Sequence, residues 1–287
     1  MGSVIRYVSH DGLNLFASSY GAEDAELTIL CVHGLTRNHK DFEPMIAALK
    51  PGYRFIAVDV RGRGESEYDR NPFNYTPPVY AQDMIMLLDE LGIEKVALIG
   101  TSMGGLVSML LMRTIPERIL GVVLNDIGPK VEKQGIQRIM NYVGKSLPYP
   151  DWDAAIQRVK ENCELDFPEY TYSDWLAFAE RICRENHKGE VVFDYDPKIR
   201  KAFRLNRNTF VATALAWRYF KSMSAVPLLL VRGALSELLS ADTAQKMIEK
   251  HGNAELVTVD AVGHAPVLDE PVVIDALNSF LSRLPRS

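Results

Sequence analysis

Short apolar runs recur along much of the chain, separated by polar turns or by helical patterns. Two β-like runs at 4–9 and 13–19 flank the turn residues His10, Asp11 and Gly12 and predict a hairpin. Six further apolar runs follow at 27–32, 53–58, 95–99, 119–124, 226–231 and 254–259. Continuous rather than alternating runs are typical of parallel strands that are covered on both faces.

Helical periodicity occupies the stretches between several of these runs. In 79–91 the side chains of Met84, Leu87, Leu88 and Leu91 fall on one helical face. Three other helical patterns lie at 103–114, 241–250 and 271–283. Strands and helices that alternate in this way indicate an α/β fold, here a mostly parallel, eight-stranded sheet flanked by helices.

The alternation stops between about 130 and 225. This stretch has helical periodicity, several prolines and no clear strand, and it is too long for a structureless loop. We interpret 130–225 as a helical cap, or lid, inserted after the sixth strand. The core domain then comprises 1–129 and 226–287.

Large aromatic side chains are the natural candidates for an apolar pocket beneath such a cap. The predicted pocket residues are Trp152, Trp175, Trp217 and Tyr142. The alternative is that these side chains pack the cap against the core.

Composition and charge exclude several functional classes. Of the 287 residues 47% are hydrophobic, enough to bury a core, and the net charge of -5 argues against a nucleic-acid partner. Cys31, Cys163 and Cys183 have spacings that fit neither a zinc site nor a disulfide framework.

The N-terminal residues lack a secretory pattern and the apolar runs are too short for a membrane span, so we expect a cytoplasmic protein with no membrane partner. The oligomeric state stays open.

A G-x-S-x-G motif stands at 100–104, directly after the apolar run at 95–99 and directly before the helical pattern at 103–114. A strand, a tight turn and a helix in this order form a nucleophile elbow, in which the serine side chain is exposed at the top of the sheet. Glycines two positions before and after the serine avoid collisions with the neighbouring backbone. The motif therefore predicts Ser102 as a nucleophile, against the alternative of a helix-capping serine.

A serine nucleophile needs a histidine base and a carboxylate that orients it. His264 follows the last apolar run and is the expected base, with the acid between Ser102 and His264 in the chain. Glu237 comes shortly after the seventh run and is the preferred acid. Asp126, at the end of the sixth run, is the alternative.

The tetrahedral intermediate of such a reaction needs two N–H donors, an oxyanion hole. One is expected to be the backbone N–H of Met103, the residue after the nucleophile. The other is expected to be the N–H of Leu35, because Gly34 lets the backbone approach a substrate closely. His33 in the same loop is interpreted as a residue that fixes the loop rather than as a catalyst.

Together these motifs resemble the α/β-hydrolase superfamily over nearly the whole chain. The His33-Gly34 loop, the turn at 59–66, the elbow at Ser102 and the Gly263-His264 pair occur in the expected order. The chain looks most like the esterase and lactonase-like group with a helical cap. Many relatives of that group carry an aspartate in a Ser-Asp-Leu-Leu string, whereas this chain reads Ser-Glu-Leu-Leu at 236–239.

The resemblance implies a serine hydrolase that cleaves a carboxylic ester or a lactone of a small, largely apolar substrate through an acyl-enzyme on Ser102. It requires no cofactor and no metal. A carbon–carbon bond hydrolase and a cofactor-free perhydrolase share the same catalytic residues and are alternatives, the former disfavoured because Ala265 follows His264 where those enzymes usually carry an aromatic residue. A small-molecule receptor with little turnover is a further alternative.

Overall fold

The computed structural model describes residues 2–145, 147–203 and 209–286. Eight strands form one sheet in the order β1-β2-β4-β3-β5-β6-β9-β10. Strands β1 and β2 pair antiparallel, β2 is antiparallel to β4, and the other neighbours are parallel, which confirms the predicted fold class. The strands are β1 (Ser3–Val8), β2 (Asn14–Tyr20), β3 (Thr28–Val32), β4 (Arg54–Asp59), β5 (Val96–Thr101), β6 (Ile119–Asn125), β9 (Leu228–Gly233) and β10 (Ala254–Val259).

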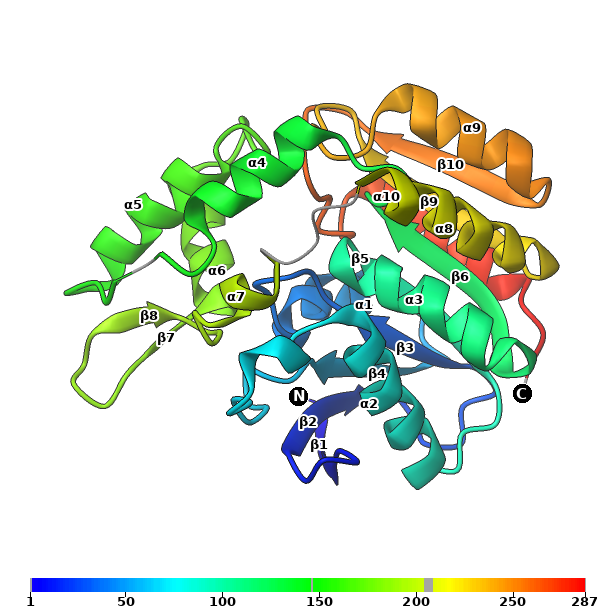
Figure 1. Ribbon diagram of the computed structural model, residues 1–287, viewed down its shortest axis with the longest axis horizontal. Coiled ribbons are helices and arrows are strands. Elements are labelled where there is room, and N and C mark those ends of the chain that lie inside the picture. Colours follow the sequence, from blue (N-terminus) through cyan, green and yellow to red (C-terminus); the bar gives the residue numbers. More distant parts are fainter. Residues whose placement is uncertain (1, 146, 204–208, 287) are drawn as a thin grey trace.

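Helices cover both faces of the sheet (Figure 1). One face carries α2 (Pro77–Glu90), α3 (Met103–Thr114), α8 (Thr209–Ser222) and α9 (Ala241–His251), and the other carries α1 (Glu43–Ala48) and α10 (Pro271–Ser282). Single 3₁₀ turns lie at His39–Phe42, Pro72–Asn74, Pro116–Arg118 and Met223–Ala225. Among the described helices, none combines the length and the apolar character needed to cross a membrane.

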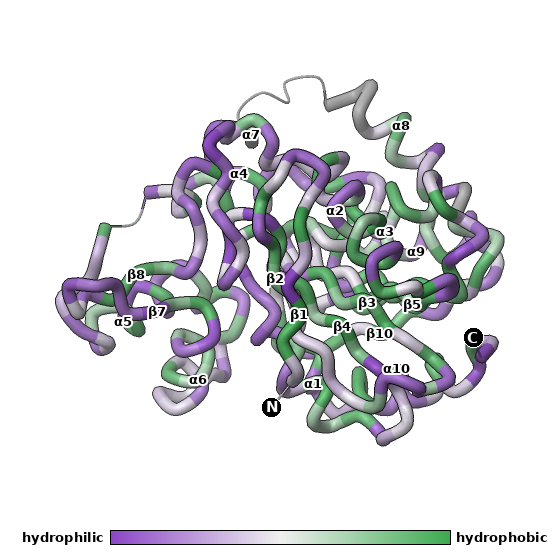
Figure 2. Tube along the Cα trace, turned by 90° about the horizontal axis from the view of Figure 1, so that it is seen from below, coloured by the Kyte–Doolittle hydropathy of each residue, from purple (hydrophilic) through white to green (hydrophobic). Residues whose placement is uncertain are grey.

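The two helical layers explain why the strands are continuously apolar. Along β3, Leu30 and Val32 pack into one core cluster, whereas Ile29 and Cys31 pack into the other. Successive side chains of a strand point to opposite faces, and here both faces are buried. Hydrophobic colour is accordingly concentrated along the central strands in Figure 2.

A separate group of elements lies beyond the carboxyl ends of the parallel strands (Figure 1). It comprises α4 (Lys133–Tyr142), α5 (Trp152–Cys163), α6 (Tyr172–Ile182), β7 (Cys183–Glu185), β8 (Val191–Phe193) and α7 (Ile199–Phe203). Ile156, Trp175 and Phe178 belong to a hydrophobic cluster of its own. The expectation of no strand in this region was wrong, because β7 and β8 form a two-stranded sheet. Three residues in each strand are too few to produce a readable period.

Helix α8 also falls within 130–225 but packs differently from these elements. It lies between α3 and α9 in Figure 1, and Phe220 joins the core cluster on that face of the sheet. The Arg113 side chain of α3 donates a hydrogen bond to the Tyr219 hydroxyl of α8 at 2.5 Å. The last helix of the predicted insert is thus part of the helical layer on the sheet.

Candidate active site

The Ser102 side chain is presented by the tight turn between β5 and α3. Its backbone has φ 51° and ψ -111°, a conformation that few non-glycine residues adopt. A Cβ at Gly100 would lie 2.5 Å from the Gly104 carbonyl oxygen, and one at Gly104 would lie 1.9 Å from the Val32 carbonyl oxygen. Both glycines are therefore required by close backbone contacts, as expected for a nucleophile elbow.

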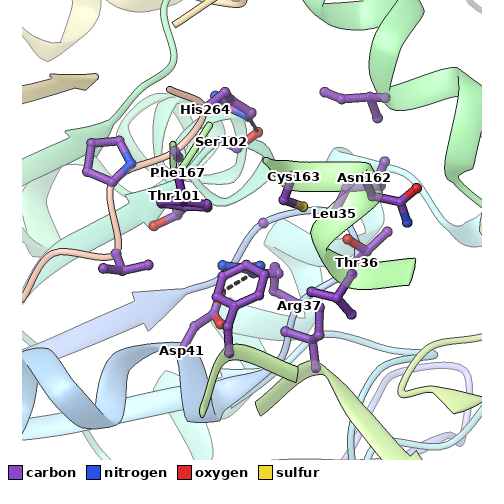
Figure 3. Close-up of a pocket in the computed structure, with 18 of the residues that line it drawn as sticks. Leu35, Thr36, Arg37, Asp41, Thr101, Ser102, Asn162, Cys163, Phe167 and His264 are labelled. Atoms are coloured by element: carbon purple, nitrogen blue, oxygen red, sulfur yellow. Dashed lines mark hydrogen bonds and ion pairs between the residues drawn. The ribbon is translucent and has the colours of Figure 1, made fainter. Parts of the chain in front are cut away.

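A continuous hydrogen-bonded chain links Ser102 to a buried carboxylate. The Ser102 Oγ lies 2.8 Å from His264 Nε2, and His264 Nδ1 lies 2.7 Å from Asp126 Oδ2. The His264 side chain is 10% exposed and that of Asp126 is fully buried. Figure 3 shows Ser102 and His264 side by side at the wall of a pocket. This arrangement lets the imidazole accept the serine proton at one nitrogen while the other is held by a carboxylate.

Asp126 is held rigidly at the carboxyl end of β6. Its backbone adopts φ 52°, and its N–H donates to the Val231 carbonyl at 2.8 Å. Its Oδ1 accepts the Gly233 N–H at 3.1 Å, and its Oδ2 accepts the Ser236 hydroxyl at 2.5 Å. These contacts leave one side of Oδ2 for His264.

Glu237, the acid preferred from the sequence, does not contact His264. It is half-buried, accepts a hydrogen bond from Gln134 Nε2 at 2.6 Å and forms an ion pair with Arg138 Nε at 3.0 Å. The expectation fails because the hydrogen bond from Gln134 and the ion pair with Arg138 hold the Glu237 side chain toward α4, while Asp126 occupies the position against His264 Nδ1. A carboxylate directly after β6 reaches the histidine, and Glu237 lies in the loop after β9 and turns toward α4.

Asp166, between α5 and α6, clamps the histidine loop and was not anticipated from the sequence. Its Oδ1 accepts the His264 backbone N–H at 2.8 Å, and its carbonyl accepts the Gly263 N–H at 2.7 Å. Arg138 of α4 donates to the same carboxylate and joins it to Glu237. A lone aspartate in a helical region carries no motif, so nothing in the sequence pattern signals this contact.

The loop at 33–35 is fixed by the ring of His33. The Val60 N–H donates to Nε2 at 3.1 Å, so the proton is on Nδ1, which donates to the Gly34 carbonyl at 2.7 Å. Burial lowers the pKa of His33 to about 4, which keeps the ring neutral. Because a trans peptide directs its C=O and N–H in opposite directions, this bond also sets the direction of the Leu35 N–H.

The two expected oxyanion donors are both available. The Leu35 N–H makes no backbone hydrogen bond within the described parts of the chain. Met103 is the first residue of α3, so its N–H has no carbonyl partner within the helix. A Cβ at Gly34 would lie 3.9 Å from the Ser102 Cβ, which places the loop beside the nucleophile.

The pocket above Ser102 is a cavity of about 80 Å³ with mostly apolar walls. Of the four aromatic candidates, only Tyr142 lines it. Trp152 donates to Glu185 Oε1 at 3.0 Å, and Trp175 is buried in the hydrophobic cluster that also contains Ile156 and Phe178. Trp217 lies on α8, close to lysines of α9. The three tryptophans were therefore wrong as pocket residues, because the periodicity of a helix does not reveal what its apolar face packs against. The aromatic residues of the pocket are Tyr142, Phe42, Phe167, Phe178 and Phe193.

The described residues also include a cysteine in the pocket and one cluster with the spacing of metal ligands. Cys163 lines the pocket, but burial raises the pKa of its thiol to about 12, which keeps it protonated and weakly nucleophilic. His10, Asp11 and Asp83 are the one cluster in the described residues with the spacing of metal ligands. Both of these carboxylates already bind the Arg61 guanidinium, at 2.6 to 3.0 Å.

Comparisons with known proteins identify relatives of this chain. The family model described as alpha/beta hydrolase fold matches residues 28–149. A 3-hydroxybutyrate-oligomer hydrolase of Cupriavidus necator is 32% identical over 97% of this chain and 96% of its own length. A 3-oxoadipate enol-lactonase of Acinetobacter baylyi is 27% identical over 60% of this chain and 58% of its own.

A solved structure resembles this chain over nearly its whole length. The crystal structure of an alpha/beta hydrolase from Novosphingobium aromaticivorans is 39% identical, superposes with a TM-score of 0.92 and covers 98% of both chains. Sheet order, elbow and full-length similarity lead to one conclusion. The chain belongs to the α/β-hydrolase family.

Proposed function

We propose that this protein hydrolyses a carboxylic ester or lactone of a small, largely apolar substrate through an acyl-enzyme on Ser102. At the coarser level the chain is a hydrolase that acts on ester bonds, in keeping with the oligomer hydrolase and the enol-lactonase that it resembles. The observation that supports this proposal is the hydrogen-bonded chain of Ser102, His264 and Asp126, with Ser102 at the wall of a mostly apolar pocket.

In the first half of the proposed reaction, the Ser102 Oγ attacks the carbonyl carbon and His264 Nε2 accepts the serine proton. The Leu35 and Met103 N–H groups stabilise the oxyanion. Asp126 keeps the Nδ1 proton in place and stabilises the imidazolium. Collapse of the intermediate breaks the ester bond, His264 returns its proton to the leaving alkoxide, and the acyl group stays on Ser102.

In the second half, water attacks the acyl-enzyme with His264 as general base, which releases the carboxylic acid and regenerates Ser102. Atoms and charges balance with water as the second substrate. Apart from the substrate and water, each step uses only side chains and backbone amides of this chain.

The cap that we propose for 130–225 supplies much of the pocket wall. Ile139 and Tyr142 of α4, Phe167 after α5 and Phe178 of α6 face the cavity. The cavity of about 80 Å³ is small beside the about 300–1,000 Å³ of typical ligand pockets, which favours a small substrate.

Covalent labelling tests the proposal. The purified protein is incubated with a fluorophosphonate and the modified peptide is identified by mass spectrometry, in parallel with turnover of 4-nitrophenyl acetate and butyrate. We expect one phosphonylated residue, Ser102, and loss of both labelling and turnover in Ser102→Ala. Ser108→Ala, which removes a buried serine of helix α3, is the matched control, and this variant should still be labelled at Ser102. Labelling elsewhere, or turnover that survives Ser102→Ala, would refute the mechanism.

A further inference from the structure

One positive charge lines the pocket beside the candidate nucleophile. Arg37 and its neighbour Asp41 lie on the pocket wall away from His264 and Ser102 (Figure 3). The Arg37 Nε donates to Asp41 Oδ2 at 2.6 Å, and the Arg37 side chain is 18% exposed. An arginine in a small apolar pocket is costly to desolvate, so its presence calls for an explanation.

Arg37 differs from Arg61 and Arg63, two arginines near the loop at 33–35. The Arg61 guanidinium binds three carboxylates, those of Asp11, Asp69 and Asp83. Arg63 donates to the carbonyls of Leu35 and Arg61, to the Tyr80 hydroxyl and to the Met103 sulfur, so its role is to hold the loops.

In contrast, Arg37 makes a hydrogen bond only through Nε within the described parts of the chain. The four N–H groups on its two terminal nitrogens are left for another acceptor. The three carboxylates around Arg61 show, in this same protein, that a guanidinium already paired with one aspartate can hold further carboxylates.

The position of Arg37 is fixed, and its aliphatic stem packs beside the loop that flanks Ser102. Its guanidinium stacks on the Phe178 ring, with Cζ 4.1 Å from the ring centroid, and Asp41 holds its Nε edge. A Cβ at Gly34 would lie 3.5 Å from Arg37 Cγ and 3.9 Å from Ser102 Cβ, so these two side chains flank the same glycine. Arg37 and Ser102 therefore line the same pocket, so one substrate can place a carboxylate at Arg37 and its reacting carbonyl at Ser102.

We propose that Arg37 binds a carboxylate of the substrate, so that the preferred substrates are short esters or lactones that carry a free carboxylate. The planar fork of a guanidinium matches a carboxylate with two parallel hydrogen bonds, and the low-dielectric walls strengthen the attraction. Asp41 and Phe178 act as positioning residues that keep the fork directed at the substrate. The inference rests on the proposed ester hydrolysis and assigns the substrate class of that same site.

Paired esters test the inference. The acidic substrate is the 4-nitrophenyl monoester of succinic acid, and the neutral one is 4-nitrophenyl butyrate, whose acyl chain has the same number of carbons. The quantity measured is the ratio of their kcat/KM values. We expect Arg37→Gln to lower this ratio about ten- to hundredfold, the size of a lost hydrogen-bonded charge contact. Arg37→Lys, which keeps a charge but loses the fork, should give an intermediate ratio.

Arg158→Gln is the matched control, because it removes the same charge from an exposed ion pair on α5. Its ratio should equal that of the wild type. An equal ratio in wild type and Arg37→Gln, or an equal fall in Arg158→Gln, would overturn the inference. Thermal unfolding of each variant checks that it is folded.

A measurement on the wild type alone keeps the two proposals separate. Glutarate and glutaramide are compared as protectors of Ser102 against the fluorophosphonate. Protection by glutarate at concentrations at least tenfold lower than glutaramide supports carboxylate binding, and equal protection overturns it. Absence of any labelling at Ser102 would instead refute the proposed function itself.

Discussion

Replacing Asp126 by asparagine tests which carboxylate orients His264, because the surrounding hydrogen bonds dictate how the amide must sit. The Gly233 N–H points at Oδ1 from 3.1 Å and is only a donor, so the amide oxygen has to occupy this position. The amide nitrogen then replaces Oδ2, where it faces the Ser236 hydroxyl and His264 Nδ1. An N–H that donates to Nδ1 requires that Nδ1 be unprotonated.

The consequence is the wrong tautomer of the catalytic imidazole. With its proton on Nε2, His264 is unable to accept the proton of the Ser102 hydroxyl, 2.8 Å away. In Ser-His-Asp hydrolases this substitution lowers kcat by about 10⁴. That factor corresponds to about 5 kcal/mol of transition-state stabilisation. We expect a loss of this size in Asp126→Asn.

Glu237→Gln is the matched control, since it makes the same carboxylate-to-amide change at the residue directly after Ser236. It removes an ion pair with Arg138 that is partly exposed to solvent, a type of contact worth about 0–1 kcal/mol. We expect kcat to stay within about threefold of the wild type. Steady-state hydrolysis of 4-nitrophenyl butyrate from pH 6 to 9 measures both variants, with thermal unfolding as the check on folding.

The reasoning fails if Glu237→Gln loses activity as strongly as Asp126→Asn. It also fails if a folded Asp126→Asn retains more than about a tenth of the wild-type kcat. Either outcome would mean that the working enzyme orients His264 by another group.

Three further outcomes follow from the same contacts. In Asp166→Ala we expect kcat to fall about ten- to hundredfold as the His264 loop loses its anchor, and Asp166→Asn, which keeps a carbonyl acceptor, should recover most of it in the same ester assay. Gly104→Ala places a Cβ 1.9 Å from a backbone oxygen, so we expect a loss of at least about 2 kcal/mol in chemical denaturation, and a loss below about 1 kcal/mol would contradict the steric argument. Burial lowers the pKa of His33 from 6.5 to about 4, so the unfolded chain binds more protons than the folded chain between these pH values. The free energy of unfolding should therefore fall by up to about 3 kcal/mol as the pH drops from 6.5 to 4. Urea titrations at several pH values measure this dependence, and the free energy of unfolding should change less with pH in His33→Asn.

The strands, the flanking helices and the elbow could be predicted because each depends on residues close together in the chain. Residues 29–32 are all apolar because both faces of β3 are covered, and this burial is visible in four consecutive residues of the sequence. The glycines around Ser102 are required by one tight turn. The fold class and the nucleophile can therefore be predicted from local sequence patterns.

The acid and the pocket wall depend on a different kind of information. Asp126 and Glu237 both follow a core strand, and only their tertiary contacts decide that Asp126 lies against His264 while Glu237 pairs with Arg138 of α4. Likewise Tyr142 and Trp175 are both aromatic residues on cap helices, yet one faces the cavity and the other is buried within the cap. Periodicity identifies an apolar face but does not say which element will cover it.

By itself, then, the sequence determined the α/β fold, the position of Ser102 at a nucleophile elbow, and the His33 and Gly34 loop, because these follow from periodicity and from turns with strict steric requirements. Only the tertiary structure decided that Asp126 meets His264, that Asp166 of the cap clamps the histidine loop, and that Arg37 faces the pocket with its terminal nitrogens free of partners in the described chain. The contacts of His264 with Asp166 and Asp126 join residues 98 and 138 positions apart, and the Arg37 contact depends on which side chains the pocket brings together. Their energies arise from the directions in which distant side chains converge, and such directions exist only once the sheet order and the placement of the cap have been set.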